Sequence, residues 1–346
     1  MKVIVAPADV GGCGFYRLIA PTTVLQKMGL DVEIDYQSQN QRAKRRNGRI
    51  VAMEPTGHDV MVIQRPIFSD IIDAIPLIQA NGTKVVIELD DDYWTIERTN
   101  TYLKDLQNHG VRTSAPRTLA KACELADLVT VSTPELAKLI PNDNVAVLRN
   151  CVPDYYLGIE ADHGTGWDLT EGKKVVGWTG NTQTHVGDLE RVGYSLRTAV
   201  RKNDAKFFCI GSVDAWAIAG FNEGEALYSD WVELIEYPKA VKTFDIGIVP
   251  LKMSRFNHCK SYLKGLEYAA LGIPFVASPT EEYKHLAKQG VGLLAPDKHD
   301  WLKQLNRLLT SDNTDFIEGG REFARENTYE RNAWKWAEAW ESTLKT

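Results

Sequence analysis

The chain has 346 residues, more than a single hydrophobic core usually serves, so two domains of roughly 150 to 200 residues are expected. Its 44% hydrophobic and 25% charged residues are ordinary for a soluble globular protein. A net charge of −6 gives no overall attraction to nucleic acid or an anionic membrane, so such a partner would need a local basic patch.

The cysteines and the longest apolar runs indicate the compartment. The five cysteines are far apart and form no C-x-x-C pair, which argues against both a disulfide framework and a zinc site. No stretch approaches the ~20 apolar residues that span a bilayer, and the first residues resemble a strand rather than a signal peptide. We expect a cytoplasmic protein with no integral membrane segment, and peripheral membrane association stays open.

The first half alternates short apolar runs with helical patterns. Strands are expected at residues 2–6, 31–36, 60–64, 84–89, 128–132 and 145–148. Helices are expected between them, for example over 15–28 and 115–126. Strands separated by crossover-length helices predict a parallel, doubly wound sheet, that is, a Rossmann-like α/β domain.

A glycine loop, "GGCGFYR", follows the first strand and precedes the first helix. Gly12, Gly14 and Arg17 are its candidate binding residues. The spacing G-x-G-x-x-R departs from the dinucleotide fingerprint at its third glycine. Because Asp35 follows at about the distance of a ribose-binding acid, a dehydrogenase remains an alternative at this point.

Basic residues crowd the segment between the second and third expected strands: Arg42, Lys44, Arg45, Arg46 and Arg49. One interpretation is a solvated loop. The other is a site for an acidic acceptor or a membrane surface, for which Arg45 and Arg46 are the candidates.

Three aspartates, Asp90, Asp91 and Asp92, end the fourth expected strand. Open α/β sheets place ligands at the carboxyl ends of their strands, so binding of acceptor hydroxyls is the favoured interpretation. A solvated turn is the alternative. The D-x-D spacing also resembles the metal site of single-domain glycosyltransferases, but two Rossmann-like halves argue against a metal here.

The second half repeats the same plan. Strands are expected at residues 174–178, 206–210, 232–234, 246–250, 274–277 and 292–294. Turn-forming residues at 150–153 mark the hinge, so the domains are expected at 1–150 and 151–328. The final helix, 329–346, carries an apolar stripe and is expected to pack back across both domains.

Two segments of the second half carry candidate ligand groups. The loop "GWTGNTQTH" offers Gly177, Gly180, Asn181, Thr184 and His185. In the second segment Lys260, Lys264 and Glu267 share one helical face by their i, i+4, i+7 spacing. That face is either solvated or, with Ser261 and the helix N-terminus, a diphosphate site.

Residues 245–278, "DIGIVPLKMSRFNHCKSYLKGLEYAALGIPFVAS", resemble the donor segment of two-domain (GT-B) glycosyltransferases. The likeness is greatest to the large retaining family of sugar-nucleotide-dependent enzymes. It implies that Glu267 binds the nucleotide ribose and that both glycine loops face the donor phosphates. A family glutamate is replaced here by Cys259, and His185 stands where many relatives have a basic pair.

The resemblance implies transfer of a sugar from a UDP-, GDP- or dTDP-sugar, with retention of configuration and no further cofactor. Lys260 and Lys264 would stabilise the leaving diphosphate, and Asp91 would be a third catalytic residue, on the acceptor side. The acceptor stays open among a glycan, a lipid-linked glycan, a protein and modified DNA, as does the oligomeric state. A nonhydrolysing sugar-nucleotide epimerase and a non-catalytic nucleotide-sugar-binding protein are the alternatives.

Overall fold

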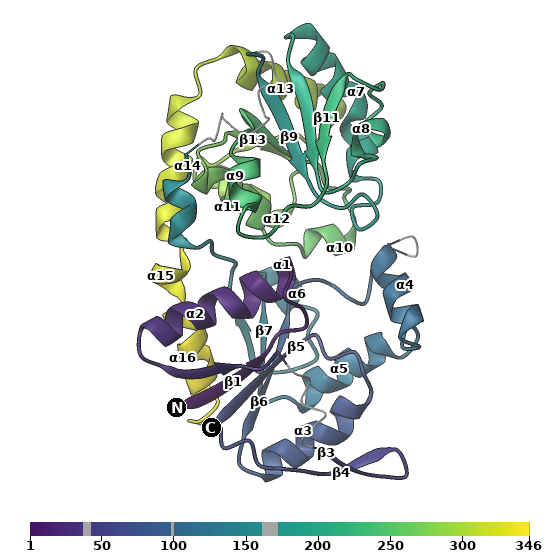
Figure 1. The fold of residues 1–346 in the computed structure, drawn as a ribbon, viewed down its shortest axis with the longest axis vertical. Coiled ribbons are helices and arrows are strands. Elements are labelled where there is room, and N and C mark those ends of the chain that lie inside the picture. The colour runs from purple at the N-terminus through teal and green to yellow at the C-terminus, as the bar shows by residue number, and fades with distance from the viewer. Residues whose placement is uncertain (37–42, 98–99, 161–171, 346) are drawn as a thin grey trace.

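The computed structural model describes residues 1–36, 43–97, 100–160 and 172–345. Two parallel six-stranded sheets with flanking helices form two Rossmann-like domains, one above the other in Figure 1. This confirms the predicted GT-B-like fold class. Within the described residues, no helix is long and apolar enough to cross a membrane.

The N-terminal sheet has the strand order β2-β1-β5-β6-β7-β8, and its paired strands are all parallel. Its strands are Lys2–Ala6 (β1), Asp31–Ile34 (β2), Val60–Gln64 (β5), Lys84–Leu89 (β6), Leu128–Val131 (β7) and Val145–Val147 (β8). The helices are Gly12–Gly14 (α1), the π-helical turn Phe15–Ile19 (η1), Ala20–Lys27 (α2), Asp70–Ala80 (α3), Thr101–Asn108 (α4), Ala115–Leu125 (α5) and Pro134–Ala137 (α6).

The C-terminal sheet has the order β11-β10-β9-β12-β13-β14, again parallel. Its strands are Val175–Thr179 (β9), Lys206–Ile210 (β10), Ala226–Ser229 (β11), Ile246–Val249 (β12), Phe275–Ala277 (β13) and Leu293–Leu294 (β14). The helices here are Asp154–Gly158 (η3, a 3-10 turn), Asp188–Lys202 (α7), Ala215–Ile218 (α8), Tyr237–Val241 (α9), Arg255–His258 (α10), Leu263–Ala270 (α11), Glu281–Lys288 (α12), Lys298–Thr310 (α13) and Thr314–Glu326 (α14).

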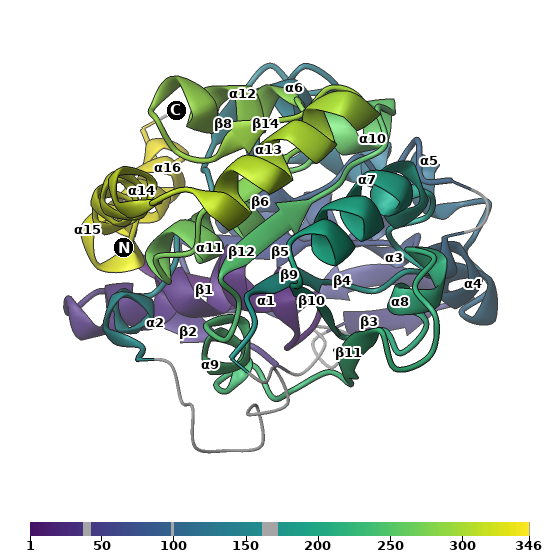
Figure 2. The same cartoon turned by 90° about the horizontal axis from the view of Figure 1, so that it is seen from above.

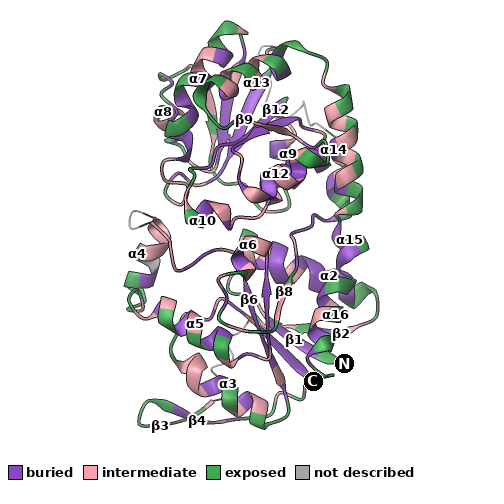
Figure 3. Ribbon diagram, turned by 180° about the vertical axis from the view of Figure 1, so that it is seen from behind, coloured by how far each residue is buried: buried purple, intermediate pink, exposed green. Residues whose placement is uncertain are grey.

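Helices cover both faces of each sheet. On β1, Ile4 packs in the cluster that includes α3 and α5, whereas its neighbours Val3 and Val5 pack in the cluster that includes α2. Successive strand residues point to opposite faces, so a strand covered on both sides is apolar throughout. Figure 3 shows this as buried central strands inside partly exposed helices.

The C-terminal segment crosses from one domain to the other along one side of the molecule (Figures 1 and 2). It consists of α14, Tyr329–Asn332 (α15) and Trp334–Ser342 (α16), so two short helices are found where one was predicted over 329–346. The Tyr329 hydroxyl donates to the backbone oxygen of Tyr16, and the Trp336 indole donates to that of Arg17. Most of the predicted apolar stripe is buried, but Leu344 is exposed.

Two further expectations about secondary structure are wrong. The strand expected at 232–234 is absent, and β11 lies earlier in the chain. The expected basic loop is an antiparallel hairpin, Ala43–Arg46 (β3) and Arg49–Met53 (β4). Asn47 and Gly48 turn it with positive φ angles of 52° and 77°, and this Asn-Gly pair is a hairpin signal that the sequence reading overlooked.

Candidate functional site

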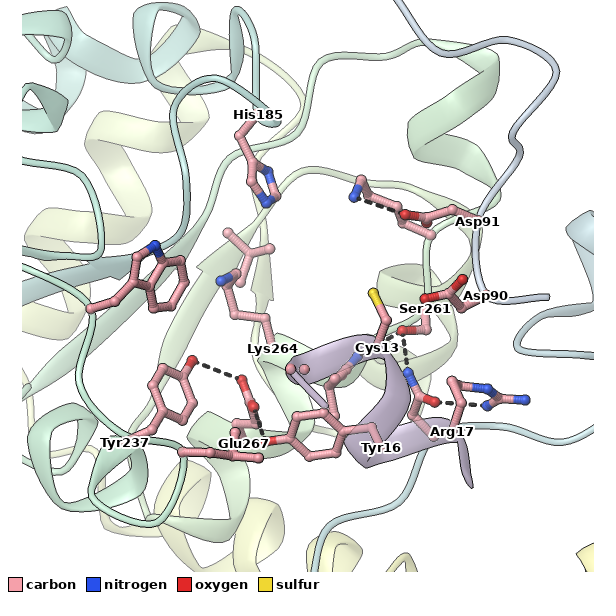
Figure 4. A pocket seen from close by; sticks show the side chains of 18 of the residues that line it. Cys13, Tyr16, Arg17, Asp90, Asp91, His185, Tyr237, Ser261, Lys264 and Glu267 are labelled. Atoms are coloured by element: carbon pink, nitrogen blue, oxygen red, sulfur yellow. Dashed lines mark hydrogen bonds and ion pairs between the residues drawn. The ribbon is translucent and has the colours of Figure 1, made fainter. Parts of the chain in front are cut away.

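A cavity of about 670 Å³ lies between the two domains, where the carboxyl ends of several strands meet (Figure 4). Its lining includes nine of the residues selected from the sequence: Gly12, Arg17, Asp90, Asp91, His185, Lys260, Ser261, Lys264 and Glu267. The other selected residues that the structure describes lie outside the lining: Gly14, Gly177, Gly180, Asn181, Thr184, Asp92, Arg45 and Arg46.

Helix α11 carries two charged residues of the cavity, Lys264 and Glu267. Glu267 is only 4% exposed, so the interpretation of this face as solvated is wrong. Because the helix begins at Leu263, Lys260 lies in the preceding turn rather than one helical turn below Lys264. Lys260 reaches the same cavity from that turn.

Lys264 and Glu267 shift one another's pKa. Burial lowers the pKa of Lys264 to about 8, partly offset by the nearby Glu267 carboxylate. Burial raises the pKa of Glu267, and Lys264 counteracts this. The Lys264 ammonium donates to the backbone oxygen of Thr179 at 2.5 Å and to its hydroxyl at 2.8 Å. A bound anion would stabilise the protonated, positively charged form of Lys264, which burial disfavours.

Two tyrosines that the sequence reading missed hold the Glu267 carboxylate. Tyr16 donates to Oε1 at 2.5 Å, and Tyr237 donates to Oε2 at 3.1 Å. Tyr16 comes from the N-terminal domain, and its hydroxyl also lies 2.6 Å from that of Tyr156. Each carboxylate oxygen retains a second lone-pair site that could accept a ribose hydroxyl. No local sequence signal links these tyrosines to Glu267.

Arg17 lines the cavity but is buried within the protein rather than presented to a ligand. It is 1% exposed and forms an ion pair with the fully buried Glu88 at 2.7 Å. Burial raises the pKa of Glu88 to about 7, and the adjacent Arg17 counteracts this. Its guanidinium also donates to the backbone of Leu148 and to Asn150 at 2.7 Å. Arg17 therefore holds Leu148 and Asn150 at the predicted hinge, and its expected contact with phosphate stays a prediction.

The hinge is tied in turn to the helix that carries Glu267. The Asn150 amide donates to the Ser261 hydroxyl at 2.8 Å, two residues before α11. A continuous polar chain thus runs from Glu88 in the N-terminal core, through Arg17 and Asn150, to Ser261. Figure 4 shows its part between Arg17 and Ser261.

The two glycine loops differ in what their glycines do. Gly12 borders the cavity, whereas Gly14 packs against the loop itself: a Cβ there would lie 1.8 Å from the Asp9 backbone oxygen. Gly177 lies inside β9, where a Cβ would meet the Phe244 ring at 2.0 Å. Its role is sheet packing rather than the approach to phosphates that we expected.

The loop after β9 folds on itself and docks on the N-terminal domain. The Asn181 backbone oxygen accepts from the amides of Thr184 and His185 at 3.0 and 2.9 Å. Asn100 donates to the Thr184 backbone oxygen at 3.2 Å. Asn181 and Thr184 thus shape the loop. Gly180, next to Trp178, has a φ of 155°.

His185 is the loop residue that faces the cavity. Its Nδ1 lies 2.9 Å from the carboxylate of the buried Asp188, at the start of α7. Burial lowers the pKa of His185 to about 4, although Asp188 opposes this shift. The ring is therefore neutral near pH 7.

The three aspartates have separate surroundings. Asp91 faces the cavity, and its carboxylate lies 3.7 Å from the Lys260 ammonium. Burial raises the pKa of Asp91, although Lys260 lowers it. Asp90 also borders the cavity, and its carboxylate accepts from the Tyr93 hydroxyl. Burial raises the pKa of Asp90, but Arg65 together with the hydrogen bonds from Cys13 and Tyr93 outweighs it, so the pKa is lowered.

Asp92 is fully buried and has a structural role in place of the expected acceptor contact. It accepts from the Trp94 amide at 3.1 Å and from the Thr95 hydroxyl at 2.5 Å. It also pairs with Arg255 of the other domain at 3.1 Å. Among the described residues, no three His, Cys, Asp or Glu side chains converge as metal ligands.

Residues 231–234 line the cavity instead of forming the expected strand. Trp231 is 55% exposed at this position, and its ring lies against the backbone of Gly211. Cys259, which replaces a family glutamate, is 3% exposed and packs in the core cluster of the N-terminal domain. It therefore faces away from the cavity.

The basic hairpin lies at the far end of the N-terminal domain from the cavity (Figure 1). Arg45 pairs with Asp70 at 2.6 Å, and Arg49 pairs with Asp73 at 2.5 Å. Arg46 is exposed, and Arg42 lies outside the described residues. The structure does not bring Arg45 and Arg46 together with the other candidates.

Comparisons with known proteins agree on the fold. No protein-family model matches the sequence, and no curated protein matches it. Among solved structures, a glycosyltransferase from Rickettsia africae is 11% identical, with a TM-score of 0.69 over 100% of this chain and 99% of its own. Anabaena Alr3699/HepE, solved in complex with UDP, is 13% identical, with a TM-score of 0.62 over 99% of this chain and 100% of its own.

A third similar structure is an E. coli trehalose-6-phosphate protein bound with UDP-2-fluoro glucose. It is 10% identical, with a TM-score of 0.64 over 98% of both chains. At such low identities the likeness concerns the fold alone. The chain therefore has a GT-B-like fold of two Rossmann-like domains.

Proposed function

We propose that this protein transfers a sugar from a nucleotide-sugar donor to an acceptor in the cavity between its domains. The proposal rests on one observation. Lys260, Lys264 and Glu267 line the same cavity as Gly12 of the opposite domain. Its volume of about 670 Å³ is within the range of cavities that enclose a small organic ligand. The nucleotide-bound structures of the same fold support a nucleotide-sugar as that ligand.

The donor would lie mainly on the C-terminal domain. The two lysines would contact the diphosphate, while Glu267 would accept hydrogen bonds from the ribose hydroxyls. Departure of the diphosphate concentrates negative charge, which fixed cations stabilise more in the transition state than in the ground state. The Lys264 ammonium, already anchored on Thr179, needs little reorganisation to do this.

The acceptor would approach from the N-terminal domain. Asp91 borders the cavity beside Lys260 and would orient an acceptor hydroxyl. Closure of the domains would exclude water and limit donor hydrolysis. We infer retention of configuration from the resemblance of residues 245–278, and NMR of the product anomer tests it.

The proposed domains are residues 1–150 together with 329–346 for the acceptor side, and 151–328 for the donor side. The separation of the strands supports this division, since β8 ends at Val147 and β9 begins at Val175.

The decisive experiment incubates the purified protein with UDP-, GDP- and dTDP-sugars, first in a thermal-shift assay and then with candidate acceptors. A ligand at 100 times its dissociation constant stabilises the folded state by about 2.7 kcal/mol. A shift followed by acceptor-dependent release of nucleoside diphosphate supports the transferase. Epimerisation without acceptor, or binding without turnover, supports the alternatives, and no shift with any nucleotide contradicts the proposal.

A further inference from the structure

A second cavity, of about 210 Å³, lies behind the hinge. Arg149 and Cys151 line it from the hinge, Tyr262 and His285 from the C-terminal domain, and Lys335 from α16. Its walls therefore belong to both domains and to the segment that joins them.

The two cavities share a wall of two chain segments. Asn150 and Ser261 border the large cavity, whereas their direct neighbours Arg149, Cys151 and Tyr262 border the small one. Along both segments, neighbouring side chains thus face different cavities. The hydrogen bond of 2.8 Å between Asn150 and Ser261 joins the two segments.

The chemistry of the small cavity favours an anion. Arg149, His285 and Lys335 line it, and none of the described lining residues is acidic. Glu282 accepts from Nε and Nη2 of Arg149, both at 3.1 Å, and no described residue accepts a hydrogen bond from the third nitrogen, Nη1. Lys335 donates to the Asn332 side chain at 2.7 Å and has no carboxylate partner among the described residues.

We propose that this cavity binds a small phosphate-bearing molecule. Guanidinium and ammonium groups form strong charge-assisted hydrogen bonds with phosphate oxygens, and positive charge in a concave site concentrates anions. At about 210 Å³ the space suits a phosphate with a short organic group and is below the usual range for drug-sized ligands. Such a molecule would bridge both domains and stabilise their present arrangement, since it binds this state preferentially.

Calorimetric titration with inorganic phosphate and with glucose 6-phosphate tests the proposal, and glucose serves as the uncharged control. Lys335→Gln and His285→Gln should each weaken phosphate binding by about tenfold, the equivalent of about 1.4 kcal/mol. Lys288→Gln, which removes the same charge from an exposed position lining neither cavity, should leave this binding unchanged.

Several outcomes would overturn the proposal. Loss of phosphate binding in Lys260→Gln but not in Lys335→Gln would place the anion in the large cavity. Equal affinity in all variants, or no binding up to millimolar phosphate, would leave the small cavity without a ligand role. Tighter binding of glucose 6-phosphate than of phosphate would support an organic phosphate, and the reverse would support phosphate itself.

Discussion

The Tyr16 hydroxyl donates to the carboxylate of Glu267 at 2.5 Å, although the two residues are 251 positions apart. One belongs to the N-terminal glycine loop region and the other to helix α11. This bond places the group proposed to bind ribose in direct contact with the opposite domain. Donor binding and the relative position of the domains should therefore be coupled.

Tyr16→Phe should lower the free energy of unfolding by about 1 to 3 kcal/mol, because a buried hydrogen bond to a charged group is lost. The ring remains, so packing changes little. Chemical denaturation measures the effect, with Tyr194→Phe at an exposed position as the control. Equal stability of both variants would show that the interdomain bond contributes nothing.

Glu267→Gln should weaken nucleotide-sugar binding by about 1 to 3 kcal/mol, since a neutral amide is a poorer acceptor for hydroxyl donors than a carboxylate. The substitution keeps the size of the side chain. Binding of the donor identified by thermal shift can be measured by calorimetry, with Glu322→Gln on exposed α14 as the control. Unchanged affinity would remove Glu267 from the donor site.

Lys264 should make nucleotide binding depend on pH. Its pKa in the free protein is lowered to about 8 by burial, so the ammonium loses its proton above that pH. A diphosphate favours the protonated form, so the dissociation constant should rise by up to about tenfold per pH unit above 8. Lys264→Gln should bind more weakly at pH 7 and lose this dependence. The same pH slope in the variant would assign it to another group.

Arg17→Met should destabilise the protein by about 3 to 5 kcal/mol, because the buried Glu88 carboxyl would lose its ion-pair partner. The matched control is Arg46→Met on the exposed hairpin, where a change within about 0.5 kcal/mol is expected. Thermal and urea denaturation compare the two variants. Equal stability would contradict the structural role assigned to Arg17.

Replacing Arg45, Arg46 and Arg49 together by Gln should leave donor binding unchanged, since the hairpin lies far from the cavity. Only an anionic acceptor long enough to reach the hairpin should bind less well. That defect should resemble the effect of high salt, because exposed charges are screened over about 8 Å at physiological ionic strength. Weaker binding of the donor itself would contradict this separation.

The sequence by itself determined the fold class and part of the site. Strand runs such as Leu128–Val131 are local patterns, and each is apolar because helices cover both faces of its sheet. The same local logic identified Lys264 and Glu267, since their spacing of three residues places them on one side of any helix.

Only the tertiary structure decided which partners those residues have. Tyr16 and Tyr237 reach Glu267 from distant segments, and Arg17 is directed toward Glu88 and the hinge instead of a ligand. The apolar residues around Trp231 line a cavity although their pattern fits a strand equally well. Sequence periodicity predicts which face of a helix or strand is buried. Which residues pack against that face depends on how distant elements come together, and no local stretch of sequence contains that information.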